Sequence, residues 1–372
     1  MTQSDTPQTM TSVMFAAPKQ VRLVETPLPP LKDGEFLVKT LYSAISAGTE
    51  LTFFHGTNPK ISQGWDVKNR LFRSEVEPDI RDVYPKLEGY MESAEVVASR
   101  HPDVAVGTRI AACYGHKNFH IVKPGDVWIP LPDELDPRLG VFVAHMGPIC
   151  MNGILYAADE VQRASITDLK DSLKGQRVMI FGAGTVGLLC GVFARWAGAS
   201  EVGIVDHIAA RLDCAERLGL TPFPASDDLP LEVKTRWVTP DPLDTGADIA
   251  VQCTGSDALL SQAFACLREQ GVVVDLGFYQ QGANLLMLGK EFHHNRLRHV
   301  CAQIGALPRH QQAEWNKNRL SKETIAVLRH SGDTLIEHMI SHTVPFSEAQ
   351  DIYQRLAGRD PSILQVVLQP DA

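Results

Sequence analysis

The second half of the chain alternates short apolar runs with amphipathic segments. After residue 175, four runs have the length and composition of strands: R-V-M-I-F-G, V-G-I-V-D, D-I-A-V-Q-C and V-V-V-D-L. Three segments between them have apolar residues at helical spacing: T-V-G-L-L-C-G-V-F-A-R-W-A, I-A-A-R-L-D-C-A-E-R-L and A-L-L-S-Q-A-F-A-C-L. This alternation predicts a parallel sheet with helices on its faces.

The first third of the chain has a different pattern. Between residues 21 and 131, short or partly alternating apolar stretches are separated by Pro and Gly, which predicts a compact β-rich unit. Residues 53–85 carry mixed charges and few periodic apolar positions, so we expect a long excursion of the kind that often covers an enzyme site. The end of the chain, S-E-A-Q-D-I-Y-Q-R-L and then I-L-Q-V-V-L, predicts a helix and a last strand.

Composition narrows the class of protein. With 372 residues, 44% of them hydrophobic, the chain is long enough for two domains. Its 35 basic and 44 acidic residues give a net charge of −9 without a Lys/Arg run, so nucleic acid and anionic membranes are poor partners. Residues 1–11 are polar and lack the order of a signal peptide, so we expect a loose tail and a cytoplasmic protein. The seven cysteines form no C-x-x-C pair and offer no structural zinc cluster.

The sequence G-A-G-T-V-G lies between the first of these strands and the first of these helices. In this context a glycine motif binds the pyrophosphate of a dinucleotide. Gly182 permits the tight turn, Gly184 lets the pyrophosphate approach the backbone, and Gly187 allows close packing of helix on strand. Thr185 and Val186 open the helix, whose N-terminus faces the phosphates.

A carboxylate, Asp206, ends the next strand, roughly 20 residues after the last glycine, at the spacing expected for this motif. Such a carboxylate accepts hydrogen bonds from both ribose hydroxyls and repels a 2′-phosphate, which favours NAD over NADP. His207 and Arg211 follow it and weaken that preference without reversing it. The alternative, glycines that serve only helix–strand packing, leaves the carboxylate unexplained.

The β-rich first unit, the mid-chain glycine motif and the last strand together resemble the medium-chain dehydrogenase/reductase superfamily, the relatives of zinc alcohol dehydrogenase. The most specific piece is V-M-I-F-G-A-G-T-V-G-L-L-C-G-V-F-A-R-W-A-G-A-S-E-V-G-I-V-D. The resemblance implies an α/β fold, a Rossmann doubly wound parallel sheet plus a β-rich GroES-like catalytic domain. It implies a GroES-like domain at 1–155, a Rossmann NAD-binding domain at 156–300 and a return to the catalytic domain at 301–372.

The same resemblance implies further cofactor-binding residues. The segments C-T-G, with Thr254 at its centre, and D-L-G-F, which ends with Gly277 and Phe278, resemble strand ends that border adenosine and nicotinamide in the superfamily. Asn152 matches a small polar residue that touches the nicotinamide in relatives.

The zinc ligands of these relatives have no counterpart here. Ser46 lies near the position of the first ligand, a Cys; Tyr90, in G-Y-M, stands where relatives carry G-H-E; and the third position falls near Pro148. A neutral serine hydroxyl is a poor zinc ligand, so we expect no catalytic zinc. A rearranged metal site is the alternative, because several suitable residues lie close to those positions: Glu92, His116, His120, His145 and Cys150.

Without zinc, hydrogen-bond donors must polarise the substrate oxygen. Tyr90 is a candidate because a phenol can donate to an oxyanion, although it could merely fill the vacated cavity. Ser46 and Thr49 lie on a turn that in relatives lies beneath the nicotinamide, where they would form a proton relay or only cap the turn. For His145, just before the expected domain junction, a chemical and a structural role are both open.

The segment E-F-H-H-N-R-L-R-H packs three histidines into seven residues. In a helix, His293 and His294 would point about 100° apart, which disfavours a shared metal ion. We expect one of them to line the substrate or cofactor pocket, and a polar interface between domains is the alternative.

These observations predict an NAD-dependent oxidoreductase that transfers hydride between nicotinamide and an alcohol or carbonyl group of a polar small molecule, without catalytic zinc. The alternatives are an NAD(P)H-dependent quinone or enone reductase, and a non-catalytic nicotinamide-binding sensor. By analogy with relatives we expect a homodimer or another homo-oligomer.

Overall fold

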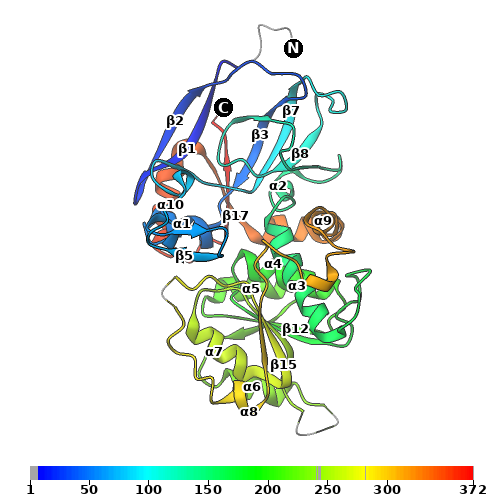
Figure 1. Cartoon of the computed structure of the whole chain (residues 1–372). Helices are drawn as coiled ribbons and strands as arrows, with labels where there is room; N and C mark the ends of the chain where they lie inside the picture. The colour runs from blue at the N-terminus through cyan, green and yellow to red at the C-terminus, as the bar shows by residue number, and fades with distance from the viewer. Residues whose placement is uncertain (1–6, 240, 242–243, 281, 372) are drawn as a thin grey trace. The chain divides into compact units, whose positions relative to one another are not determined.

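The alternating segments after residue 175 form one parallel sheet in a computed structural model of the protein, which describes residues 7–239, 241, 244–280 and 282–371 (Figure 1). The chain forms two units: unit 1 comprises Met1–His145 and Ile340–Ala372, and unit 2 comprises Met146–Met339. Unit 2 therefore begins before residue 156 and continues past residue 300 to the end of a long helix.

The sheet of unit 2 has six strands in the order β13-β12-β11-β14-β15-β16, and all neighbouring strands are parallel. The strands are β11 (Arg177–Phe181), β12 (Glu201–Asp206), β13 (Thr221–Pro224), β14 (Ala247–Gln252), β15 (Leu267–Asp275) and β16 (Arg298–Cys301). Because they are parallel, their carboxyl ends lie at one edge, where the glycine motif follows β11. The predicted doubly wound parallel sheet is confirmed.

Helices cover both faces of this sheet. Met179 and Phe181 of β11 point to the face covered by α6 and α7, where they share a buried core with Val233 and Phe264. On the other side α3, α4 and α9 contact one another, and α5 contacts α9. The helices are α3 (Met146–Gln162), α4 (Thr185–Trp196), α5 (Ala209–Arg217), α6 (Leu229–Arg236), α7 (Asp257–Cys266), α8 (Glu291–His294) and α9 (Lys317–Met339), with a 3-10 turn, η3 (Arg309–Gln311).

Unit 1 is β-rich, as its sequence predicts. One sheet has the order β2-β1-β6, and a larger one has the order β10-β8-β7-β3-β18-β17, with β9 paired to β3. The strands are β1 (Thr9–Ala17), β2 (Gln20–Pro27), β3 (Phe36–Ala44), β6 (Lys86–Leu87), β7 (Glu92–Ser99), β8 (Arg109–Ala112), β9 (Phe119–Val122), β10 (Trp128–Pro130), β17 (Ile340–Pro345) and β18 (Gln365–Gln369). The C-terminal strand β18 pairs antiparallel with β3, so the chain returns to the first unit.

Short elements complete unit 1: α1 (Ala47–Phe54), α2 (Pro137–Gly140), α10 (Ala349–Ala357), η1 (Pro59–Ile61), η2 (Ile80–Asp82) and η4 (Phe346–Glu348). The excursion at 53–85 contains a small hairpin of β4 (Gly64–Asp66) and β5 (Leu71–Arg73).

Of the tail expected at 1–11, residues 1–6 lie outside the described residues, while residues 9–11 belong to β1 and pair with β2. The β pairing overrides the polar composition of this segment. Within the described part of the chain, every helix is too short or too polar to span a bilayer.

Candidate functional site

The glycine motif forms the turn from β11 to α4. Gly182 has φ +102°, and a Cβ there would lie 2.4 Å from the Thr254 methyl group. A Cβ on Gly187 would lie 1.7 Å from the Gly182 carbonyl oxygen, so both positions exclude a side chain. A Cβ on Gly184 would meet nothing within 4 Å, and no side chain caps the first turn of α4. The uncapped N–H groups of that turn suit the pyrophosphate of a dinucleotide.

Asp206, at the end of β12, is only 6% exposed and is tied to this turn. One carboxylate oxygen accepts the Ala183 N–H at 2.8 Å and the other accepts the Ile208 N–H at 2.9 Å. His207 Nδ1 lies 3.4 Å and Arg211 Nη1 4.0 Å from the carboxylate. The carboxylate therefore fixes the glycine turn, a role that its sequence position did not predict, and keeps lone pairs for ribose hydroxyls.

Two other predicted cofactor residues meet at the same edge of the sheet. The N–H and the hydroxyl of Thr254 donate to Gln252 Oε1, at 3.2 and 3.3 Å. A Cβ on Gly277 would lie 2.1 Å from the Thr254 carbonyl oxygen, so these two loops run against each other. Phe278, which follows, is 51% exposed. The structure thus brings the strand ends and the glycine motif together.

Asn152 lies on α3 and is fully buried. Its Nδ2 donates to the carbonyl oxygens of Ala302 and Ala306 at 3.1 and 3.3 Å, directly after β16. Its Oδ1 is buried and has no hydrogen-bond partner among the described residues. Since buried acceptors are rarely left unpaired, this oxygen suits a donor from a bound molecule, such as a carboxamide.

In unit 1, four predicted residues lie together. Ser46 begins helix α1, and its hydroxyl is hydrogen-bonded to that of Tyr90. Thr49 Oγ1 lies 3.4 Å from the same phenolic oxygen and is exposed. The rings of Tyr90 and His145 meet edge to face, with centroids 4.8 Å apart. Residues spread over a hundred positions therefore converge on the side chain of Tyr90.

Beneath this group, Glu50 holds the turn in place. Its carboxylate accepts the Ser46 N–H at 2.7 Å, lies 3.0 Å from His116 Nε2, and accepts the hydroxyl of Tyr353 from α10. Glu50 and His116 are both completely buried. A buried ion pair of this kind restricts the positions of the residues hydrogen-bonded to it. Separating the two charges would leave each without a partner in the protein interior, which destabilises the folded state.

The network continues through Ser43, whose hydroxyl lies 2.7 Å from His116 Nδ1 and donates to Glu92 at 3.1 Å. Burial opposes the charged imidazolium, but the Glu50 and Glu92 carboxylates outweigh it and raise the pKa of His116. Burial likewise raises the pKa of Glu92, despite the nearby His116 charge and the Tyr114 N–H. The two acidic neighbours thus favour the protonated form of His116.

The donor set does not fit a zinc ion. Ser46 and Tyr90 offer neutral hydroxyls bonded to each other, and the described residues contain no group of three His, Cys, Asp or Glu that could hold a metal. The residues of the alternative metal site have other partners. His120 stacks on Tyr114, and burial and Lys117 lower its pKa to about 4.

Three other residues of the alternative metal site also have hydrogen-bond partners. Cys150 donates to the Val186 carbonyl, at 3.6 Å, and Glu92 and His116 share the hydroxyl of Ser43. We derive no step through a metal.

His293 and His294 are placed elsewhere. Both are exposed on α8, just before the amino end of β16. Asn295, one residue on, accepts the N–H of Gln270 near the start of β15, at 2.8 Å. In a parallel sheet the amino ends lie opposite the edge that carries the glycine motif, so within unit 2 these histidines lie away from the candidate cofactor residues.

Sequence reasoning missed three residues of the buried network: Ser43, Glu50 and Tyr353. Glu50 had a local signal, because it lies four residues after Ser46 and thus one helical turn away. Tyr353 had none, since it reaches Glu50 from a helix 303 positions away in the sequence.

Comparison with known proteins gives consistent results. Residues 185–315 match the model of the zinc-binding dehydrogenase family. D-guloside 3-dehydrogenase of Escherichia coli (strain K12) is 24% identical over 358 residues, which cover 95% of this chain and 97% of that protein. D-xylulose reductase A of Aspergillus niger is 33% identical over 159 residues, covering 42% and 40%. The structure of 2R,3R-butanediol dehydrogenase from Bacillus subtilis aligns with a TM-score of 0.72 at 18% identity, covering 97% of this chain and 100% of that one.

The family match starts inside the glycine motif, and the structural match spans both units. The parallel sheet, the uncapped start of α4 and the β-rich unit to which the chain returns agree with these findings. Residues 185–315 therefore match a domain of zinc-binding dehydrogenases, and the chain has the fold of 2R,3R-butanediol dehydrogenase.

Proposed function

We propose that this protein is an NAD-dependent dehydrogenase/reductase that interconverts a hydroxyl and a carbonyl group on a polyhydroxylated small molecule. We further propose that the hydroxyl pair of Tyr90 and Ser46, rather than zinc, manages the oxygen and its proton. The observation that carries the proposal is this pair, held on a turn that Glu50 fixes. The names of relatives, a guloside dehydrogenase and a xylulose reductase, support the substrate class.

The nicotinamide cofactor, when bound, supplies or accepts the hydride. In the reducing direction, the Tyr90 hydroxyl donates a hydrogen bond to the substrate oxygen and gives up its proton as the carbon is reduced. Ser46 then passes a proton to the phenolate, and Thr49, which is exposed, connects the pair with solvent. In the oxidising direction the same groups carry the proton outwards.

The preference for NAD rests on Asp206. A buried carboxylate beside the glycine turn repels a 2′-phosphate, while its remaining lone pairs accept hydrogen bonds from the ribose hydroxyls. Arg211 Nη1, at 4.0 Å, offsets part of this negative charge, so we expect a preference rather than exclusion of NADP.

The test measures turnover of wild type and a Tyr90→Phe variant with NADH and a panel of ketoses, and with NAD and the matching polyols. Loss of the phenolic hydroxyl should lower kcat by about 10²- to 10³-fold, the usual effect of removing a proton donor or oxyanion partner. The affinity for NADH should stay the same. Tyr42→Phe, on β3, removes a hydroxyl from the same unit and is the control.

Turnover of Tyr90→Phe within twofold of wild type would remove the proposed donor. Metal analysis of chelator-washed protein tests the other half of the proposal. About one zinc per chain, lost together with activity, would show that the mechanism uses a metal.

A further inference from the structure

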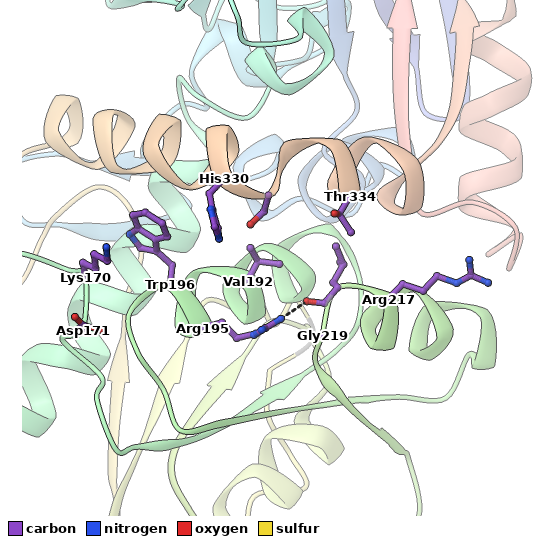
Figure 2. Close-up of a pocket in the computed structure, with 11 residues that line it drawn as sticks. Lys170, Asp171, Val192, Arg195, Trp196, Arg217, Gly219, His330 and Thr334 are labelled. Carbon is purple, nitrogen blue, oxygen red and sulfur yellow. Dashed lines mark hydrogen bonds between the residues drawn. The ribbon is translucent and has the colours of Figure 1, made fainter.

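Unit 2 contains a cavity of about 720 Å³ that the proposed function does not use. It is bounded by the carboxyl ends of α4 and α5, by α9 and by the loop before β11 (Figure 2). The glycine motif lies at the other end of α4, about 17 Å away along the helix axis. The cavity is therefore separate from the place of the cofactor pyrophosphate.

The charges around this cavity contrast with those of the chain, whose net charge is −9. Lys170, Arg195, Arg217 and His330 line it, and Asp171 is the only acidic residue among the lining residues. Several arginines elsewhere in unit 2 have carboxylate partners, as in Arg177–Asp248 and Arg298–Glu160. Among the described residues, none of the four cations of the cavity forms an ion pair.

Other hydrogen-bond donors face the same space. Lys170 Nζ lies 5.3 Å from the centre of the Trp196 ring, and the ring of His330 lies 5.7 Å from it on the α9 side. The hydroxyl residues Ser331 and Thr334 line the wall formed by α9. Donors thus outnumber acceptors, which is the composition that binds an anion.

Helix capping does not account for these cations. Arg195 donates to the carbonyl of Leu218 at 2.9 Å, drawn as a dashed line in Figure 2, and so uses one of its five N–H groups. The ends of α4 and α5 are closed by backbone bonds, from Gly198 to Arg195 at 2.9 Å and from Gly219 to Glu216 at 2.8 Å. Lys170, Arg217 and His330 are therefore not needed at either helix end.

We propose that this cavity binds a small phosphate-bearing molecule. Lys and Arg side chains form charge-assisted hydrogen bonds with phosphate oxygens, and the hydroxyls of Ser331 and Thr334 supply neutral donors. A volume of about 720 Å³ accommodates a molecule between a sugar phosphate and a nucleotide in size. The site binds the phosphate group independently of the cofactor.

The experiment is a calorimetric titration with inorganic pyrophosphate at constant ionic strength, in the presence of saturating NADH, which occupies the glycine motif. The variant Lys170→Gln/Arg217→Gln removes two cations of the cavity and should weaken pyrophosphate binding at least tenfold. The variant Arg22→Gln/Lys322→Gln removes two charges outside the cavity and should bind like wild type. Citrate, a polyanion without phosphate, should bind at least tenfold more weakly than pyrophosphate.

Equal affinities of the two double variants would overturn the proposal, and so would citrate binding as tightly as pyrophosphate. A second measurement needs no variant. On the wild-type chain, pyrophosphate should protect Lys170, but not Lys322, from an amine-acetylating reagent, as read by peptide mass spectrometry. Equal labelling of Lys170 with and without pyrophosphate would contradict the site.

Discussion

The glycine turn of unit 2 and the hydroxyl cluster of unit 1 reach a functional geometry by opposite routes. The glycine turn is built from six consecutive residues, and Asp206, which anchors it, ends the neighbouring strand. The hydroxyl cluster is built from the start of α1, from Tyr90 two residues before β7 and from His145 directly before α3, and it is hydrogen-bonded to a carboxylate that α10 also contacts. A local motif is defined by backbone conformation, whereas an assembled site depends on buried charge.

This difference determines which kind of substitution should disrupt each region. The glycine turn excludes side chains at positions where a Cβ would meet backbone atoms, so it should fail through steric changes. The hydroxyl cluster depends on a completely buried Glu50–His116 pair, so it should fail through loss of charge. Substitutions of each kind test the comparison.

The largest effect is expected for Glu50→Gln. The change keeps the size of the side chain but leaves His116 without its buried carboxylate partner, and removing one member of such a pair costs about 3–5 kcal/mol. We expect a loss of this size in the free energy of unfolding, measured by urea titration. Turnover should fall with it, because glutamine offers one acceptor oxygen where two carboxylate oxygens serve the Ser46 N–H, His116 and the Tyr353 hydroxyl.

Glu25→Gln, on the exposed strand β2, is the matched control and should change stability by less than 0.5 kcal/mol. A loss below about 1 kcal/mol for Glu50→Gln would mean that the pair contributes little. The comparison between the two regions would then lose its physical basis.

The same contrast explains how much could be predicted from the sequence. The parallel sheet, the glycine turn and Asp206 were predictable because periodicity and short spacing encode them. Ser46, Thr49, Tyr90 and His145 were proposed from a resemblance, and only tertiary structure brings them together. The acceptor role of Asp206 towards the glycine turn also has no sequence signal, because it depends on how β11 and β12 pair.

The histidines at 293 and 294 show why composition alone does not locate a site. A dense cluster of titratable residues indicates chemistry only if the fold places it at a binding site. In a parallel sheet, whether a segment precedes or follows a strand determines at which edge of the sheet it lies. These residues precede β16, and residues before a parallel strand lie at the edge opposite the glycine motif.

The next largest effect is expected for Gly187→Ala. Its Cβ would lie 1.7 Å from the Gly182 carbonyl oxygen, so α4 must move away from β11. We expect NADH affinity, measured by fluorescence titration, to fall about 100-fold, which corresponds to about 2.8 kcal/mol. Gly184→Ala should keep wild-type stability but lose affinity, because open space surrounds that position.

Gly289→Ala, another position with no atom within 4 Å, is the control and should bind NADH normally. If Gly187→Ala bound NADH as tightly as wild type, steric exclusion would not explain the glycine at this position.

A smaller effect is expected for Asp206→Asn, which removes a charge and keeps the shape. The ratio of the NADPH to the NADH dissociation constant should fall about tenfold, since the repulsion of a 2′-phosphate disappears while Arg211 stays. Taking the ratio cancels any general loosening of the glycine turn. An unchanged ratio would contradict the proposal that Asp206 binds the ribose hydroxyls and repels a 2′-phosphate.

The smallest effect concerns pH and distinguishes the two regions again. The pKa of His116 is raised above its ordinary 6.5, so above that pH the folded protein holds a proton that the unfolded chain has lost. The raised pKa of Glu92 acts in the same direction above 4.5. Because the folded state binds more protons, the contribution of His116 to stability is full below pH 6.5 and is lost as pH rises through its folded pKa, by at most about 1.4 kcal/mol per pH unit for each proton. Urea titrations from pH 6 to 9 should show this slope in wild type and in Gly187→Ala but a flatter one in His116→Gln, and equal slopes in all three would show that the buried pair is not the group that titrates.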